Sequence, residues 1–174
     1  MTRTLSQQIA AIARLHGTFT LRSGEVSDTY FDKYRFEAEP ALLHAICEAM
    51  RPLVPPDTHV LAGLEMGGIP LATVLSQLTG IPTAFIRKEA KAYGTCRYAE
   101  GVDLPTRGVV LIEDVVSSGG AILDAVAKLR TDGIEPSVAV CVIDRESGGR
   151  EALAEQGIEL RVLLKISDLE DASS

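Results

Sequence analysis

Apolar runs alternate with helical stretches along the chain from residue 59 onward. Five runs have strand length and are rich in aliphatic residues: 59–64, 82–87, 109–112, 137–143 and 160–164. Glycine-bearing turns and apolar residues at helical spacing follow three of them. Strands that alternate with helices in this way predict a parallel α/β sheet with helices on both faces. Such sheets bind ligands at the carboxyl ends of their strands.

The first 58 residues have a different pattern. A helix is predicted after Ser6, a suitable cap, because apolar residues recur at helical spacing up to Gly17. Residues 19–21 and 29–32 read as short strands on either side of a turn. Residues 40–54, which begin with proline, predict a second helix.

Residues 88–108 join the second and third runs of the repeating pattern. They are rich in charge and glycine and poor in periodic apolar residues. A connection of this length in a compact domain is usually functional or disordered. We therefore expect a mobile loop that closes over substrate.

Composition narrows the possible functions. With 174 residues, the chain is long enough for a single domain, expected to span 1–174. The net charge of −7 disfavours a nucleic-acid-binding module. Cys47, Cys96 and Cys141 are too scattered for a disulfide framework or a zinc site, which favours a reducing compartment. No apolar run is long enough to span a membrane, so we expect a cytoplasmic enzyme.

The segment 109–121 carries the strongest chemical signal. An apolar strand leads into Glu113 and Asp114, and the small residues 117–121 then open a helix. Backbone N–H groups of such a loop, together with the helix dipole, favour a bound phosphate. The two acids can accept hydrogen bonds from ribose hydroxyls or hold magnesium through water. The alternative is an ordinary strand–turn–helix without a ligand.

A cluster of cations follows the preceding strand. Arg87, Lys88 and Lys91 lie within five positions, ahead of a loop that contains glycine. Three cations can neutralise a diphosphate, and a loop can deliver them after substrate binds. The alternative is a solvated charged surface.

The segment 109–121 resembles the phosphoribosyl diphosphate signature of type I phosphoribosyltransferases. The resemblance implies their fold, a Rossmann-like parallel sheet flanked by helices with a small N-terminal hood over about 1–35. It also implies that the acids face the ribose and that the following residues hold the 5′-phosphate. The implied residues are Glu113, Asp114, Val115, Val116, Ser117, Ser118, Gly119, Gly120 and Ala121.

Residues 87–94 are similar to the Arg-Lys-x-x-Lys-x-His-Gly stretch of orotate phosphoribosyltransferases, with Tyr93 in place of histidine. In that family the loop lysine reaches the diphosphate in the partner subunit's site, which implies a homodimer with shared sites. By this resemblance Arg87, Lys88 and Lys91 bind diphosphate, and Lys91, Glu113 and Asp114 are the catalytic residues.

The N-terminal Phe-Thr-Leu-x-Ser-Gly stretch at 19–24 resembles the same family's hood. The resemblance implies that Arg22 contacts phosphoribosyl diphosphate and that Tyr30 and Phe31 flank orotate, although these two aromatics could simply be core residues. Arg145 and Ser117 are also implied to contact orotate. A guanidinium matches a carboxylate in bidentate fashion, whereas the alternative for Arg145 is a salt bridge with a neighbouring acid.

Residues 63–70 resemble the diphosphate-binding loop of these enzymes, with Gly67 where many members carry lysine. The resemblance as a whole implies transfer of a phosphoribosyl group to orotate with Mg²⁺ held mainly by substrate and water, so that no side chain binds the metal directly. Two alternatives stay open. One is a phosphoribosyltransferase for another base, and the other is a regulatory protein that senses phosphoribosyl diphosphate.

Overall fold

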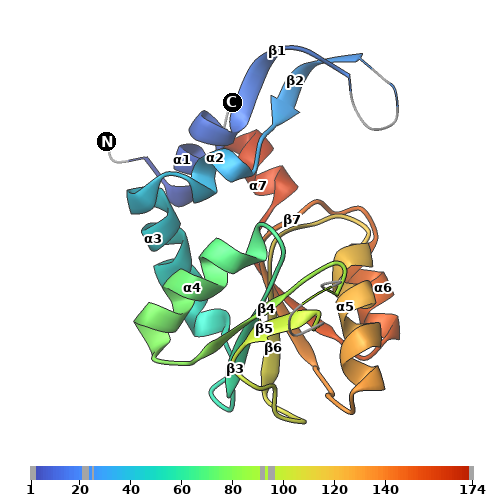
Figure 1. Ribbon diagram of the computed structural model, residues 1–174. Coiled ribbons are helices and arrows are strands. Elements are labelled where there is room, and N and C mark those ends of the chain that lie inside the picture. Colours follow the sequence, from blue (N-terminus) through green and yellow to red (C-terminus); the bar gives the residue numbers. More distant parts are fainter. Residues whose placement is uncertain (1–2, 21–23, 25, 91–92, 94–96, 173–174) are drawn as a thin grey trace.

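The computed structural model describes residues 3–20, 24, 26–90, 93 and 97–172 (Figure 1). In chain order its elements are α1 (Leu5–Ala13), β1 (Arg14–Thr20), β2 (Val26–Phe31), α2 (Tyr34–Glu37), α3 (Pro40–Met50), the 3₁₀ turn η1 (Arg51–Leu53), β3 (Val60–Leu64), α4 (Gly68–Thr79), β4 (Thr83–Ile86), β5 (Ala99–Gly101), β6 (Val109–Val116), α5 (Gly120–Thr131), β7 (Val138–Asp144), α6 (Gly149–Glu155), β8 (Glu159–Lys165) and α7 (Ile166–Asp171).

The main sheet has six strands in the order β5-β4-β3-β6-β7-β8. All neighbouring strands pair in parallel except β4 and β5, which are antiparallel. Helices α3 and α4 cover one face and α5 and α6 the other (Figure 1). The expected α/β sheet with helices on both faces is confirmed, with an antiparallel strand added at one edge.

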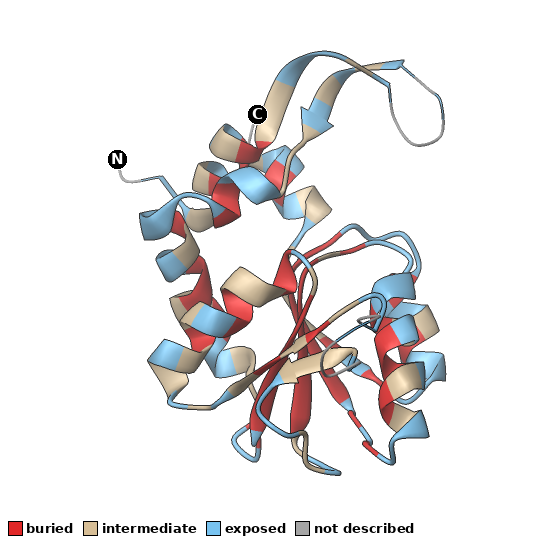
Figure 2. Cartoon of the chain, viewed as in Figure 1, coloured by how far each residue is buried: buried red, intermediate tan, exposed pale blue. Residues whose placement is uncertain are grey.

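Aliphatic side chains fill both sides of the sheet. Every residue of β3 and β7 is buried, as expected for central strands covered on both faces (Figure 2). One apolar cluster joins the sheet to α1, α3, α4 and α7, and the other joins it to α5 and α6. The core therefore needs few aromatic residues.

The N-terminal segment forms a separate layer above the sheet. Strands β1 and β2 pair in an antiparallel hairpin, with a register shift between His16 and Phe19 (Figure 1). The helix before them was predicted too long. It is capped by Thr4 through a capping box rather than by Ser6, and ends at Ala13 because Arg14 and Leu15 pair with β2.

Three further boundaries differ from the sequence prediction. The helix at Pro40 ends at Met50, where Pro52 cannot donate an intrahelical hydrogen bond and a 3₁₀ turn follows. Strand β5 interrupts the loop expected over 88–108, because it pairs with the edge of β4. Strand β6 continues through both acids to Val116, since its pairing with β7 extends to Asp144. The short helices α2 and α7 were not predicted.

Candidate active site

A cavity of about 670 Å³ opens at the carboxyl ends of β3, β4 and β6 and along α5. Charged and polar side chains contribute to its lining, and glycines lie at the start of α5. The lining residues are Leu64, Glu65, Ile86, Arg87, Lys88, Glu89, Glu113, Val115, Val116, Ser117, Ser118, Gly119, Gly120, Ala121, Ile122, Asp124, Ala125 and Lys128. The structure thus brings the predicted phosphate loop together with Arg87 and Lys88.

The phosphate loop runs from Ser117 to the first turn of α5. Gly119 precedes that helix with φ +79°, a conformation that side chains other than glycine rarely adopt. It also packs against the backbone of Gly149, where an added Cβ on Gly149 would lie 2.3 Å from the carbonyl oxygen of Ser117. Both serines stay exposed. The amino end of a twelve-residue helix therefore faces the cavity, as anion binding requires.

The two adjacent acids of β6 point to different surroundings, as successive strand residues do. Glu113 lines the cavity although it is 94% buried, and its Oε1 accepts a hydrogen bond of 3.1 Å from the backbone N–H of Asp114. Burial, together with the hydrogen bond and charge of Asp114, raises the pKa of Glu113 well above its usual value. Asp114 is fully buried and is absent from the cavity lining.

Asp114 instead faces helix α2. Its carboxylate accepts hydrogen bonds from Lys33 Nζ (2.9 Å) and from the backbone N–H of Val115 (2.6 Å), both at Oδ1. Burial acts to raise the pKa of Asp114, but hydrogen bonds with Glu113, Glu37 and Lys33 outweigh burial and lower it. Asp114 is thus an ionised, internally held carboxylate behind the cavity wall.

The segment after β4 brings its two cations to the cavity. The backbone N–H of Arg87 donates to Tyr98 O (2.7 Å), and the backbone N–H of Lys88 donates to Glu65 Oε1 (2.5 Å). The ammonium of Lys128 on α5 donates to the carbonyl of Lys88. The hydroxyl of Tyr98 donates to Asp132 Oδ2 (2.7 Å), directly after α5. These contacts fix the base of the expected substrate loop.

Sequence reasoning missed Lys128 and Asp124 as cavity residues, whereas Glu65 belongs to the 63–70 stretch that resembles a diphosphate-binding loop. A signal was present on α5, because Ala121, Asp124, Ala125 and Lys128 have the spacing of one helix face. That face begins in the phosphate loop, so its next turns had to border the same cavity.

Comparisons with known proteins agree with this geometry. A family model described as phosphoribosyl transferase domain matches residues 54–157. The orotate phosphoribosyltransferase of Nocardioides sp. is 50% identical over 97% of this chain and 94% of its own length. The crystal structure of Mycobacterium tuberculosis orotate phosphoribosyltransferase with Fe(III) dicitrate superposes with a TM-score of 0.86, at 32% identity over 95% of this chain and 96% of its own.

This chain belongs to the orotate phosphoribosyltransferase family. A second structure of the M. tuberculosis enzyme, in complex with 5-phospho-α-D-ribosyl 1-diphosphate, has a TM-score of 0.82 and 27% identity, over 95% of this chain and 96% of that one. The expected resemblance to the family and to its fold is therefore confirmed.

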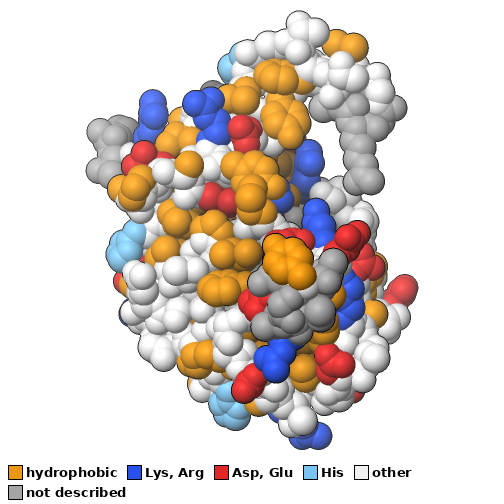
Figure 3. All heavy atoms as spheres, in the orientation of Figure 1, with side chains coloured by type: hydrophobic (Ala, Val, Ile, Leu, Met, Phe, Trp, Pro, Cys, Tyr) orange, Lys and Arg blue, Asp and Glu red, His pale blue; other side chains and the backbone are white. Residues whose placement is uncertain are grey.

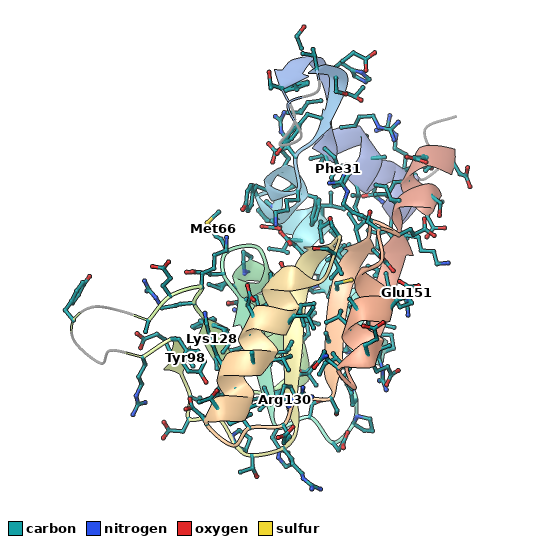
Figure 4. All side chains as sticks on the ribbon, turned by 90° about the vertical axis from the view of Figure 1, so that its right-hand side faces the viewer. Phe31, Met66, Tyr98, Lys128, Arg130 and Glu151 are labelled. Carbon is teal, nitrogen blue, oxygen red and sulfur yellow. The ribbon has the colours of Figure 1, made fainter. Side chains whose placement is uncertain are left out.

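Of the residues expected to contact orotate, Ser117 lines the cavity, whereas Tyr30, Phe31 and Arg145 do not. Tyr30 is exposed on β2, with its ring centroid 5.5 Å from that of Phe19. Phe31 is half-buried and packs towards Phe36, at 6.4 Å between centroids (Figure 4). Arg145 is exposed directly after β7, and its backbone N–H donates to the carbonyl of Val116.

The alternative salt bridges for Arg145 are absent from the described residues. Asp144 pairs instead with Arg150 (3.5 Å) and Glu146 with Lys165 (3.8 Å), which leaves the Arg145 guanidinium without an ion-pair partner in the described part of the chain. The hydrogen bond of Arg145 to Val116 puts its backbone beside Ser117, another residue expected to contact orotate.

Two of the expected site residues, Arg22 and Lys91, lie outside the described residues. The described residues contain no group of three or more His, Cys, Asp and Glu side chains arranged to hold a metal ion. Within the same residues, no helix is both long and apolar enough to cross a membrane.

Proposed function

We propose that this protein transfers the 5-phosphoribosyl group from phosphoribosyl diphosphate to N1 of orotate, in the synthesis of pyrimidine nucleotides. The products are orotidine 5′-monophosphate and pyrophosphate. The observation that carries the proposal is the cavity in which the phosphate loop at the start of α5 faces Arg87 and Lys88. A molecule with phosphates at both ends of a ribose needs two such binding regions, one for each end.

The chain's own groups supply binding at both ends of the sugar. Backbone N–H groups over Ser117–Ala121 would hold the 5′-phosphate, and Glu113 would accept hydrogen bonds from the ribose hydroxyls. Arg87 and Lys88, together with Lys91 of the loop, would face the diphosphate. When the bond from the ribose carbon to diphosphate breaks, positive charge develops on the sugar and negative charge on the leaving group. Fixed cations beside that leaving group lower the barrier.

Magnesium fits this site as an ion carried by the substrate. Mg²⁺ keeps several waters and usually binds through substrate phosphates, and it prefers hard oxygen donors. The cavity presents carboxylates of this kind at Glu65, Glu89 and Asp124. When bound, the ion would add positive charge against the diphosphate. The protein's part is to orient the diphosphate through its own cations and the turn after β3.

Orotate would sit between the hood and the end of β7. Arg145 has no ion-pair partner among the described residues, so its guanidinium is available to a carboxylate. Ser117 and the exposed ring of Tyr30 would complete the base site, together with Phe31, whose ring packs towards Phe36. This assignment requires the hood hairpin to approach the cavity when substrate binds.

We also propose a homodimer with shared active sites. Large apolar side chains are exposed on the hood and near the cavity, and hydrophobic side chains gather over this face in Figure 3. They are Val26, Tyr30, Tyr34, Met66 and Tyr93, with exposed fractions of 43–77%. A second copy of the chain would cover part of this surface. The cytoplasmic location expected from the scattered cysteines stays a prediction.

Subunit complementation tests the shared site. A Lys91→Ala chain and a Glu113→Gln chain are each expected to be nearly inactive alone. If Lys91 serves the partner's cavity, a mixed dimer contains one site in which both residues are intact, and mixing restores part of the activity. No restoration in a verified mixed dimer would show that each chain uses its own Lys91.

The decay of orotate absorbance tests the reaction itself. Orotate should be consumed only when phosphoribosyl diphosphate and magnesium are both present, and a chelator in a parallel sample should stop the reaction. Uracil and adenine serve as control bases. Consumption of a control base instead of orotate would refute the base assignment. Binding of phosphoribosyl diphosphate without turnover of any base would favour a regulatory protein.

A further inference from the structure

A buried ion pair connects the hood to the strand that carries the site acids. Lys33 stands at the start of α2, and its ammonium lies 2.7 Å from Oδ2 and 2.9 Å from Oδ1 of Asp114 on β6. The Asp114 side chain has no exposed surface, whereas that of Lys33 is one-third exposed. A buried carboxylate depends strongly on such a partner, since losing the partner leaves an uncompensated charge.

A second residue of α2 converges on the same carboxylate. Glu37 is 92% buried, and its Oε1 has no hydrogen-bond partner within the described residues other than the Asp114 carboxylate. Gly67, in the turn after β3, packs between the two acids. A Cβ built on Gly67 would lie 1.8 Å from Asp114 Oδ2 and 2.9 Å from Glu37 Oε1. The cluster therefore closes only because position 67 has no side chain.

Charge in the cluster is consistent with one ionised and one protonated carboxyl group. Burial, followed by the hydrogen bond and charge of Asp114, raises the pKa of Glu37 to about 9, so that Glu37 is protonated at neutral pH. Burial acts to lower the pKa of Lys33, but Asp114 outweighs burial and raises it. The other titratable groups that act on these residues are Glu113, Asp32 and Tyr34.

The cluster is linked to the cavity by one further hydrogen bond. The backbone N–H of Asp114 donates to Glu113 Oε1, and the Asp114 carboxylate accepts from the next N–H along the strand. The orientation of the Asp114 peptide thus bears directly on the carboxylate of Glu113, which lines the cavity.

We propose that Lys33 and Glu37 are positioning residues for phosphoribosyl diphosphate binding. They hold Asp114 from the hood side, and Asp114 in turn holds Glu113 towards the ribose. This inference rests on the proposed function, since it assigns the ribose to Glu113. In this arrangement α2 links the hood, where the base would bind, to strand β6, where Glu113 would bind the ribose.

Binding of phosphoribosyl diphosphate with magnesium, measured by calorimetry without orotate, tests the proposal. Lys33→Met is expected to weaken binding between about tenfold and 100-fold, because a small displacement of a positioned group has effects of that size. Lys33→Arg should recover most of the loss. Arg35→Ala, which removes an exposed cation from the same helix, is the matched control and should bind within about twofold of wild type.

The pH dependence of binding separates positioning from general destabilisation. Without Lys33, Asp114 takes up a proton more readily, so the acid limb of the binding curve should move to higher pH in Lys33→Met. The double variant Lys33→Met/Asp114→Asn should lose less than the sum of the two single variants, because it leaves no unpaired charge. Unchanged binding and an unchanged acid limb in folded Lys33→Met would overturn the proposal.

Glu37 provides a second route if Lys33→Met does not fold. Glu37→Gln keeps a hydrogen-bond donor towards Asp114 and should bind within about twofold of wild type, whereas Glu37→Leu should bind more weakly. Equal binding by the two variants would overturn the role of Glu37. A wrong proposed function would give a different result. In that case the wild-type protein itself would neither bind phosphoribosyl diphosphate nor consume orotate.

Discussion

Lys33 and Asp114 are 81 residues apart in the chain and form an ion pair with an N–O distance of 2.7 Å. One residue starts the helix under the hood, and the other lies in the strand that leads to the phosphate loop. The hood is therefore connected to the site by an ion pair as well as by apolar packing. Changes around this pair should affect substrate binding and pH dependence together.

Gly67 is expected to tolerate no side chain. In Gly67→Ala the added methyl group would meet Asp114 Oδ2 at 1.8 Å, so either the acid or the turn after β3 must move. Overpacking of this kind costs about 1–3 kcal/mol of unfolding free energy. Urea denaturation should show that loss, and calorimetry should show weaker binding of phosphoribosyl diphosphate. Stability and binding equal to wild type would contradict the tight packing at this position.

Stability should fall with rising pH because of Glu37. The pKa of the Glu37 carboxyl group is about 4.5 in the unfolded chain and about 9 in the folded protein. Between these values the folded state keeps a proton that the unfolded state has released, so the unfolding free energy decreases as pH rises.

Glu37→Gln cannot titrate and should lack this contribution. Denaturant titrations from pH 5.5 to 9 should show its stability increasing relative to wild type, by at most about 1.4 kcal/mol per pH unit. A difference between the two proteins that stays constant over this range would show that Glu37 is ionised in the fold.

Lys91→Ala should fold normally and lose turnover by about 100-fold, the scale of one lost charge contact to a transition state. Steady-state rates with both substrates saturating, together with a thermal unfolding curve, would test this. Arg97→Ala is the control, since Arg97 belongs to the same connection and, within the described residues, forms an exposed ion pair of 3.4 Å with Asp103. Near-normal turnover in Lys91→Ala would refute the role of the loop lysine.

Arg145→Ala should raise the KM for orotate by about tenfold or more, since a charge-assisted bidentate contact would be lost. Binding of phosphoribosyl diphosphate, measured separately, should not change. Uracil lacks the carboxylate, so its weak competition against orotate should be equal in wild type and variant. A variant that loses affinity for uracil as much as for orotate would indicate a general distortion of the base site.

The local sequence was sufficient to predict much of the fold and part of the candidate site. The aliphatic runs that became β3, β6 and β7 are buried strands because continuous apolar segments of that length need cover on both faces. The small residues after β6 predicted the phosphate loop, and the cavity contains them. Elements whose ends depend on a distant strand were less predictable, as the early end of α1 and the presence of β5 show.

Residue types and their order in the chain thus determined the α/β class, the phosphate loop and the family resemblance, because these depend on periodicity and on short contiguous motifs. Only the tertiary structure decided that Glu113 faces the cavity while Asp114 faces Lys33 and Glu37, and that Lys128 reaches the carbonyl of Lys88. The reason is physical. The direction of a strand side chain and the partner of a buried charge are set by elements brought together across the fold, and no local pattern encodes them.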